Sequence, residues 1–170
     1  MRKCTTVRLS TIARAIASVA LAFAATSCAF AGGDRAPARA MAAGHMSCPP
    51  DDAKTVVALV NDLRHRAGLH LLGNDAYLAR FASRRSAAMA DDRRLSHSGW
   101  ESGLRNAGLT DEALGENVAY NFATPDAVVA GWMQSPGHRA NILRPIYKRI
   151  GVGCVIDDRG HRWWTQDFAG

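Results

Sequence analysis

The sequence lacks the short motifs that mark the commonest enzyme classes. Its 170 residues contain no HExxH or CxxC, no G-x-S-x-G, no phosphate-binding loop and no dinucleotide fingerprint. It also lacks a long basic run, because residues 32–170 carry 17 basic and 15 acidic side chains and acids interrupt the arginine clusters. Nucleic-acid backbones bind clustered Lys and Arg. We therefore expect no nucleic-acid partner, and any catalytic or metal-binding residues must come together through the fold.

Acidic residues are missing from positions 1–31, which carry four basic residues and an apolar stretch over 15–25. Ala29-Phe30-Ala31 has the small-x-small pattern that signal peptidase accepts, so we predict a signal peptide over 1–31 and a secreted or periplasmic protein beginning at Gly32. Arg14 leaves too few apolar residues to span a bilayer, so no transmembrane span is expected after processing. Lipid anchoring at Cys28 is the alternative, since Ala25-Thr26-Ser27-Cys28 loosely resembles a lipoprotein signal.

Cysteine is scarce, with four in the chain. Residues 32–50 are rich in Ala, Gly and Pro without periodicity, which predicts a flexible linker before a folded domain over 51–170. Once the leader is removed, Cys48 and Cys154 remain as the possible intramolecular pair in an oxidising compartment. Their disulfide would close a loop of about 105 residues and stabilise the fold by roughly 4–5 kcal/mol. Two free thiols are the alternative, with Cys154 filling a strand position.

The pattern after residue 50 predicts helices followed by a β-hairpin. Apolar residues recur every three or four positions over 53–67, and Gly68 ends the run. A second helix is expected after an Asn74-Asp75 cap, with Arg80, Arg84 and Arg85 as its solvated face. A short helix over 101–107, an extended segment over 115–120 and helices after 124 and 135 follow. Alternating residues over 150–156 and a returning strand after 160 complete an α+β domain.

Three side chains capable of chemistry lie at breaks in the regular pattern. They are His97 in LSHSGW, Glu116 in GENVA and His138 in SPGHRANIL. Two imidazoles and one carboxylate suit a zinc-type site with an open position. Spacing alone does not establish such a site, because imidazoles also cap loops and Glu116 can accept backbone N–H groups in a tight turn.

The ordered blocks LSHSGW, GENVA, VVAGWMQSPGHRANIL, RIGVGC and WWTQDFAG resemble the bacterial SCP-like branch of the CAP superfamily of cysteine-rich secretory, antigen 5 and pathogenesis-related 1 (PR-1) proteins. The resemblance covers about 51–170. It implies a three-layer α-β-α sandwich with a central antiparallel sheet, and a cleft lined by two His and two acidic residues. His97, Glu116 and His138 match three of those four positions. The fourth, three residues after Trp132, is Ser135, which we expect to cap the next helix through its hydroxyl rather than to act as a nucleophile.

Two functions follow from this resemblance. The first is a secreted, monomeric, non-catalytic binding module whose His/Glu cleft takes a small apolar molecule, an envelope component or another protein. The alternative is a metal-assisted or general acid/base hydrolase of the peptidase type that uses His97, Glu116 and His138. With one carboxylate the cleft is expected to bind zinc weakly, and protonation of the histidines should release the ion. Trp100 and Trp132 are expected to pack in the core.

Overall fold

The computed structural model describes residues 44–170, so the predicted signal peptide and most of the predicted linker lie outside the described range. Within that range, no helix has the length and apolar character needed to cross a membrane. The elements are β1 (Met46–Ser47), α1 (Pro50–Arg66), β2 (Gly73–Asn74), α2 (Ala76–Asp92), α3 (Trp100–Asn106), β3 (Leu114–Tyr120), α4 (Pro125–Gln134), α5 (Pro136–Ile142), β4 (Arg149–Ile156) and β5 (Arg162–Ala169).

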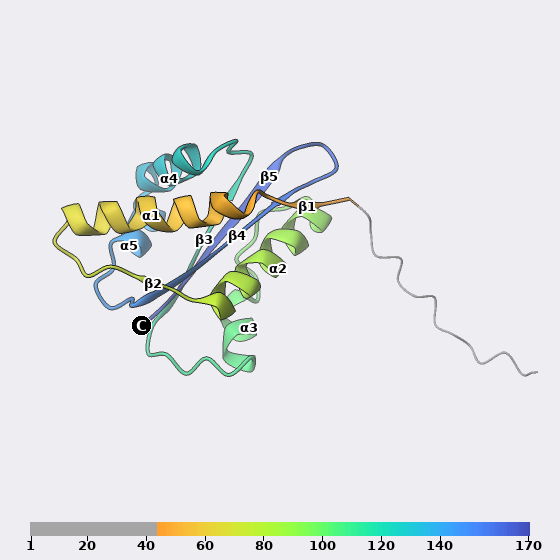
Figure 1. Ribbon diagram of the computed structural model, residues 1–170. Helices are drawn as coiled ribbons and strands as arrows, with labels where there is room; N and C mark the ends of the chain where they lie inside the picture. The colour runs from red at the N-terminus through yellow and green to blue at the C-terminus, as the bar shows by residue number, and fades with distance from the viewer. Residues whose placement is uncertain (1–43) are drawn as a thin grey trace, which may run out of the picture. The chain divides into compact units, whose positions relative to one another are not determined.

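The strands form one sheet between two helical layers (Figure 1). The strand order is β1-β4-β5-β3, with antiparallel pairing throughout that path and a short parallel pairing of β2 with β4. Apolar side chains of α1, α4 and α5 pack on one face of the sheet, and those of α2 and α3 pack on the other. The expected three-layer α-β-α sandwich is confirmed.

Helix α2 lies unusually close to β4 because two strand residues on that face are glycines. A Cβ atom added at Gly151 would lie 2.1 Å from the backbone nitrogen of Ala79, and one at Gly153 would lie 2.2 Å from that of Ser83. Neither position can accept a side chain without moving the helix. This close contact fixes α2 over the middle strands, and so fixes the place of the arginines that it carries.

The helix starts follow the local signals in the sequence, with one difference. The Asp75 carboxylate accepts the backbone N–H groups of Tyr77 and Leu78, and the Thr124 hydroxyl accepts that of Ala127, as N-caps do. Ser135 precedes α5 as expected, but its hydroxyl makes no capping hydrogen bond. The predicted side-chain cap is therefore wrong: Ser135 also ends α4, and only its carbonyl serves α5, by accepting the N–H of Arg139.

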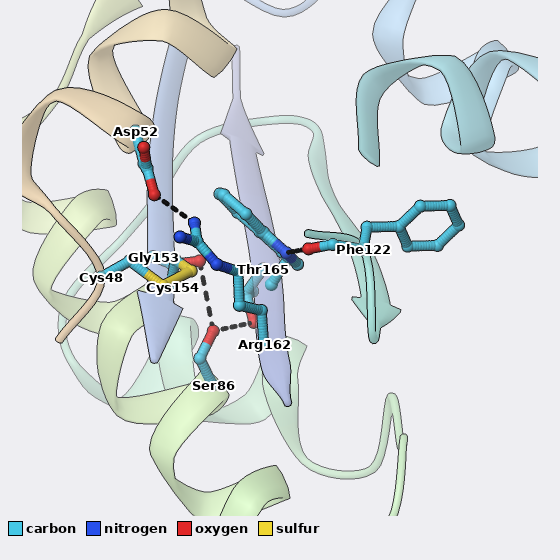
Figure 2. The surroundings of a disulfide bond; sticks show 9 residues. Cys48, Asp52, Ser86, Phe122, Gly153, Cys154, Arg162 and Thr165 are labelled. Carbon is cyan, nitrogen blue, oxygen red and sulfur yellow. Dashed lines mark hydrogen bonds and ion pairs between the residues drawn. A yellow bond between two sulfur atoms is a disulfide. The ribbon is translucent and has the colours of Figure 1, made fainter. Parts of the chain in front are cut away.

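The Cys48–Cys154 disulfide is present, with the two Cα atoms 5.4 Å apart (Figure 2). The backbone N–H of Cys48 also donates to the carbonyl of Cys154, and β1 pairs with the end of β4. Beside the bridge, Arg162 of β5 forms an ion pair with Asp52 of α1. Sheet pairing and the bridge therefore hold residues 46–48, which lie in the predicted linker, against β4.

An arginine lies inside the predicted apolar stripe of α1. Arg64 is fully buried and donates to the carbonyls of His70, Ile142, Arg144 and Tyr147 at 2.8–3.4 Å. Burial lowers the pKa of its guanidinium from the usual value. These hydrogen bonds tie α1 to the segment that leads from α5 into β4, which helps to hold the helical layer that carries His138.

Candidate functional site

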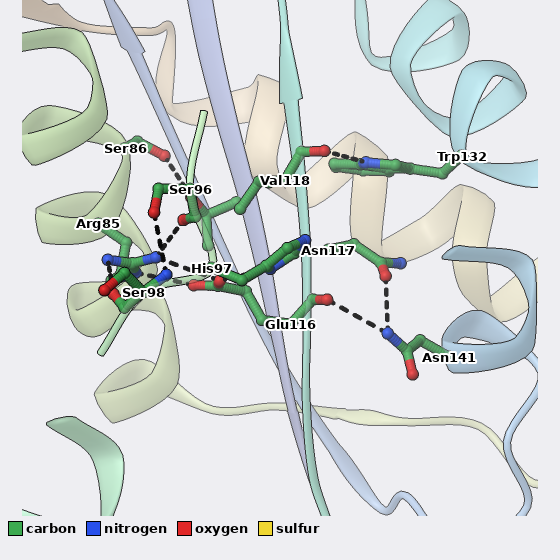
Figure 3. Close-up of polar contacts among 11 residues, drawn as sticks. Arg85, Ser86, Ser96, His97, Ser98, Glu116, Asn117, Val118, Trp132 and Asn141 are labelled. Atoms are coloured by element: carbon green, nitrogen blue, oxygen red, sulfur yellow. Dashed lines mark hydrogen bonds and ion pairs between the residues drawn. The ribbon is translucent and has the colours of Figure 1, made fainter. Parts of the chain in front are cut away.

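The centre of the candidate site is a buried ion pair between α2 and β3 (Figure 3). The Glu116 side chain is 0% exposed, and its Oε2 accepts Nε of Arg85 at 2.8 Å while Oε1 accepts Nη2 at 3.2 Å. The prediction that Arg85 belongs to a solvated face is wrong, because its side chain is only 15% exposed. Arg85 instead neutralises the one acidic residue that the sequence assigned to the cleft.

Arg85 also holds the loop that carries His97. Its Nη2 donates to the Ser96 carbonyl at 2.5 Å and its Nη1 to the Ser98 carbonyl at 3.1 Å, so the backbone is fixed on both sides of the histidine. Nδ1 of His97 donates to Oε1 of Glu116 at 2.9 Å. The His97 side chain is half exposed. Because its Nδ1 is bonded to Glu116, Nε2 is the nitrogen available to a ligand.

His138 reaches the site from α5, on the other side of β3. Its ring centroid lies 6.5 Å from that of His97, with the two rings inclined by 51°. Burial, and secondly the charge of His97, lower the pKa of His138 from the ordinary histidine value. At neutral pH this imidazole is therefore uncharged, and can donate one hydrogen bond and accept another.

A set of side-chain amides attaches α5 to β3. Asn141 donates to the backbone carbonyl of Glu116 at 3.2 Å and to Oδ1 of Asn117 at 2.9 Å. Asn117 in turn donates to the His138 carbonyl and to Oε1 of Gln166, both at 3.1 Å. Figure 3 shows Asn141 across the strand from the Arg85–Glu116 pair. The amides therefore fix the position of His138 relative to Glu116, although the sequence analysis did not single them out.

Asp167 on β5 is a second buried acid that the sequence analysis missed. The strand register places it directly opposite Glu116, and the residue is fully buried. Neither carboxyl oxygen has a hydrogen-bond partner within the described structure. Burial first, and then the neighbouring charge of Glu116, raise the pKa of Asp167 well above the ordinary value, whereas Arg85 opposes the shift. The available signal was an acid within the predicted final strand.

Asp167→Asn is expected to stabilise the protein at pH 8 by about 1–3 kcal/mol, because it removes an ionisable group that has no partner. A carboxyl with a raised folded-state pKa contributes stability that is full below its unfolded pKa, about 4, and is lost as pH rises through the folded value. The gain from Asn should therefore shrink as pH falls towards 4. Urea unfolding between pH 4 and pH 8 measures the difference in unfolding free energy between the variant and wild type, with Asp92→Asn at an exposed position as the control. A gain independent of pH would contradict the assignment.

The predicted site residues differ in what they contact. His97 and Glu116 are hydrogen-bonded, and His138 lies beside His97, as described above. Ser135 is half-buried next to α5 and makes no side-chain cap. Among residues 44–170 no group of three or more His, Cys, Asp or Glu side chains is arranged to hold a metal ion. Since Arg85 occupies both oxygens of Glu116, the residues present do not fit the three-ligand zinc site considered from the sequence.

The tryptophans belong to the core, as expected. Trp132 is 1% exposed, and its Nε1 donates to the carbonyl of Val118 at 3.3 Å. Trp100 packs against the apolar cluster of α2 and α3. Trp132 is therefore closed to solvent, and Trp100 is half-buried.

Comparison with known proteins agrees with this fold. The family model described as the cysteine-rich secretory protein family, CAP, matches residues 57–168. The uncharacterized protein YkwD of Bacillus subtilis is 38% identical over 122 residues, which are 69% of this chain and 46% of the relative. The uncharacterized membrane protein YlbC of the same organism is 33% identical over 120 residues, 68% of this chain and 33% of the relative. The chain thus spans less than half the length of these curated relatives.

Solved structures give the same result. An extracellular protein containing an SCP domain from Bacillus anthracis is 28% identical, with a TM-score of 0.63 over 73% of this chain and 44% of that one. An outer surface protein of Borrelia burgdorferi is 18% identical, with a TM-score of 0.69 over 75% of this chain and 98% of that one, and supports the fold alone. The family model covers more than half of the sequence, so this chain belongs to the CAP family of cysteine-rich secretory proteins.

Proposed function

We propose that the chain is an exported, non-catalytic binding module that holds its ligand between His97 and His138. The observation that carries this proposal is the state of Glu116, whose carboxylate is buried and bonded to both Arg85 and His97. A carboxylate held in this way has no free oxygen with which to take a proton from a substrate or water. Its role is to orient His97, and the two imidazoles are the groups left to meet a ligand.

The two imidazoles suit a ligand that forms hydrogen bonds. They lie 6.5 Å apart at the edge of the sheet, and His138 is neutral at ordinary pH. Each neutral imidazole supplies one donor and one acceptor. This chemistry favours an uncharged polar group on an envelope component or on a protein over a wholly apolar small molecule.

One observation favours the hydrolase alternative. The lowered pKa of His138 leaves an imidazole able to accept a proton near pH 7, as a general base must. Turnover of peptide and ester substrates by the full chain separates the two functions, with the His97→Ala/Glu116→Gln/His138→Ala triple variant as background. The binding-module proposal expects the same rate for both proteins. A rate above the triple-variant background would replace it by a hydrolase.

Zinc titration tests whether His97 and His138 act as a pair. Because Arg85 holds Glu116, we expect zinc binding by the two imidazoles alone, which is weak and fades as pH falls through the histidine range, since protonated imidazole cannot ligate. His97→Ala and His138→Ala should each abolish it, whereas the exposed His65→Ala, a control on α1, should have no effect. Calorimetry on the full chain measures the affinity. Unchanged zinc affinity in the double variant would contradict the pairing.

Export is supported by the disulfide and by the likeness to an extracellular SCP protein of B. anthracis. A bridge between Cys48 and Cys154 persists in oxidising compartments and is uncommon in the cytosol. Intact-mass analysis of exported protein is expected to give a chain that begins at Gly32. A lipid-modified species that begins at Cys28 would contradict this and would place the protein on a membrane surface.

A further inference from the structure

A cavity lies on the same face of the sheet as Glu116, at the far end of β3. Its volume is about 390 Å³, within the range of small-molecule sites. Tyr120 in its lining is four residues beyond Glu116 on the same strand face, so the two are roughly 13 Å apart along the strand. The cavity is lined by Arg93, Arg94, Leu95, Tyr120, Asp157, Arg159 and Trp163. The lining therefore shares no residue with the site around Glu116, His97 and His138.

The lining of the cavity includes two exposed apolar side chains. Leu95 and Tyr120 are large apolar residues that remain 43% and 36% exposed, and both line it. The Tyr120 ring lies 4.3 Å from the ring of Trp163 and 5.3 Å from that of His161, which fixes its orientation. Two exposed apolar side chains lining one cavity form a surface on which a planar group can stack.

The charge of the lining is predominantly positive. Arg93 is held by Asp158 at 2.8 Å, whereas in the described part of the chain Arg94 and Arg159 have no carboxylate partner. Asp157 is the acidic residue of the lining, and its carboxylate already accepts N–H groups from Trp163, Arg159 and His161 at 2.9–3.0 Å. The lining thus contains three arginines, one of them paired with Asp158, and one carboxylate whose oxygens are already hydrogen-bonded.

We propose that this cavity binds a small organic anion with a flat apolar body, of the class of aromatic carboxylates. The ring of such a ligand lies against Tyr120 and Leu95, and its carboxylate lies between Arg94 and Arg159. Guanidinium groups form paired hydrogen bonds with carboxylates and stack on aromatic faces, so one residue type serves both parts of the ligand. The site does not depend on the function proposed for the histidine cleft.

The probe for this site is 2-naphthoate, titrated into the full chain and followed by amide and indole NMR signals. We expect saturable shifts centred on Leu95, Tyr120 and Trp163, and affinity about tenfold lower for the uncharged 2-naphthamide. Arg94→Gln/Arg159→Gln should weaken naphthoate binding by at least about tenfold while leaving the remaining spectrum unchanged. The matched control is Arg80→Gln/Arg139→Gln, which removes two exposed arginines elsewhere and should bind as wild type.

Three results would overturn the proposal. The first is equal affinity for naphthoate and naphthamide, which would remove the anionic requirement. The second is undiminished naphthoate binding in Arg94→Gln/Arg159→Gln. The third is the absence of saturable shifts at Tyr120 and Trp163. A further variant, Leu95→Ser, removes only apolar surface at an exposed position. It is expected to lower the affinity for naphthoate and for naphthamide by the same factor, and so tests the stacking surface separately from the charge.

Discussion

Replacing Arg85 by methionine is expected to lower the free energy of unfolding by about 3–5 kcal/mol. Methionine keeps most of the side-chain volume but removes the charge that neutralises Glu116. The Glu116 side chain is 0% exposed and faces Asp167, so the variant would leave a buried carboxylate without its cationic partner beside a second buried acid. The loop at 96–98 would also lose the two hydrogen bonds that hold its carbonyls. Urea unfolding at pH 7 measures the loss.

A control variant and a rescue variant distinguish the loss of the Arg85 charge from the loss of its packing. Arg84→Met changes an exposed arginine next to Arg85 on the same helix and is expected to cost less than about 1 kcal/mol. Adding Glu116→Gln and Asp167→Asn to Arg85→Met should restore much of the stability, because the buried acids no longer need neutralising. If Arg85→Met lowers the free energy of unfolding by less than about 1 kcal/mol, the ion pair is not the centre of the site.

Removing the disulfide with Cys48→Ala/Cys154→Ala is expected to cost about 4–5 kcal/mol. The bridge joins residues 106 positions apart, and so constrains most of the described chain in the unfolded state. Both cysteines are also largely buried, in the cluster that α1, α4 and α5 form on the sheet. Denaturant unfolding of the double variant and of oxidised wild type measures the difference.

Reduction provides the control for the double variant. Reduced wild-type protein should unfold with nearly the same midpoint as Cys48→Ala/Cys154→Ala, whereas adding a reductant to the variant should change nothing. Thiol titration of unfolded but unreduced protein should likewise find Cys48 and Cys154 unreactive. Equal stabilities of the oxidised and reduced wild-type proteins would show that the bridge contributes little to the fold.

The elements that the sequence predicted have local causes. Asp75 and Thr124 are recognisable as caps because each bonds to backbone groups two or three residues away. The final hairpin is visible as alternation over 150–156 with a turn after it. The approach of His97 to Glu116 came from a different source, the resemblance to the family.

The missed features depend on partners far along the chain. Arg85 was predicted to be solvated because a helical pattern shows only which face of the helix a residue lies on. It does not show that Glu116, 31 residues later, is buried against that face. Asp167 and Arg64 lie in patterns of apolar residues, and their burial depends on the sheet register and on carbonyls about 80 residues away. Residues 46 and 47 of the predicted linker form β1 because they pair with residues 155 and 156 of β4, far along the chain.

The role of Glu116 is tested most directly by the tautomer of the His97 ring, read from ¹H–¹⁵N correlations of the imidazole nitrogens in the full chain. In the neutral ring we expect the proton on Nδ1, donated to Glu116, and an unprotonated Nε2 that is left for a ligand. Glu116→Gln should shift the balance of the two tautomers, and the distant His65 should be unaffected. A His97 ring that carries its proton on Nε2 would contradict the claim that Glu116 is committed to holding this histidine for binding.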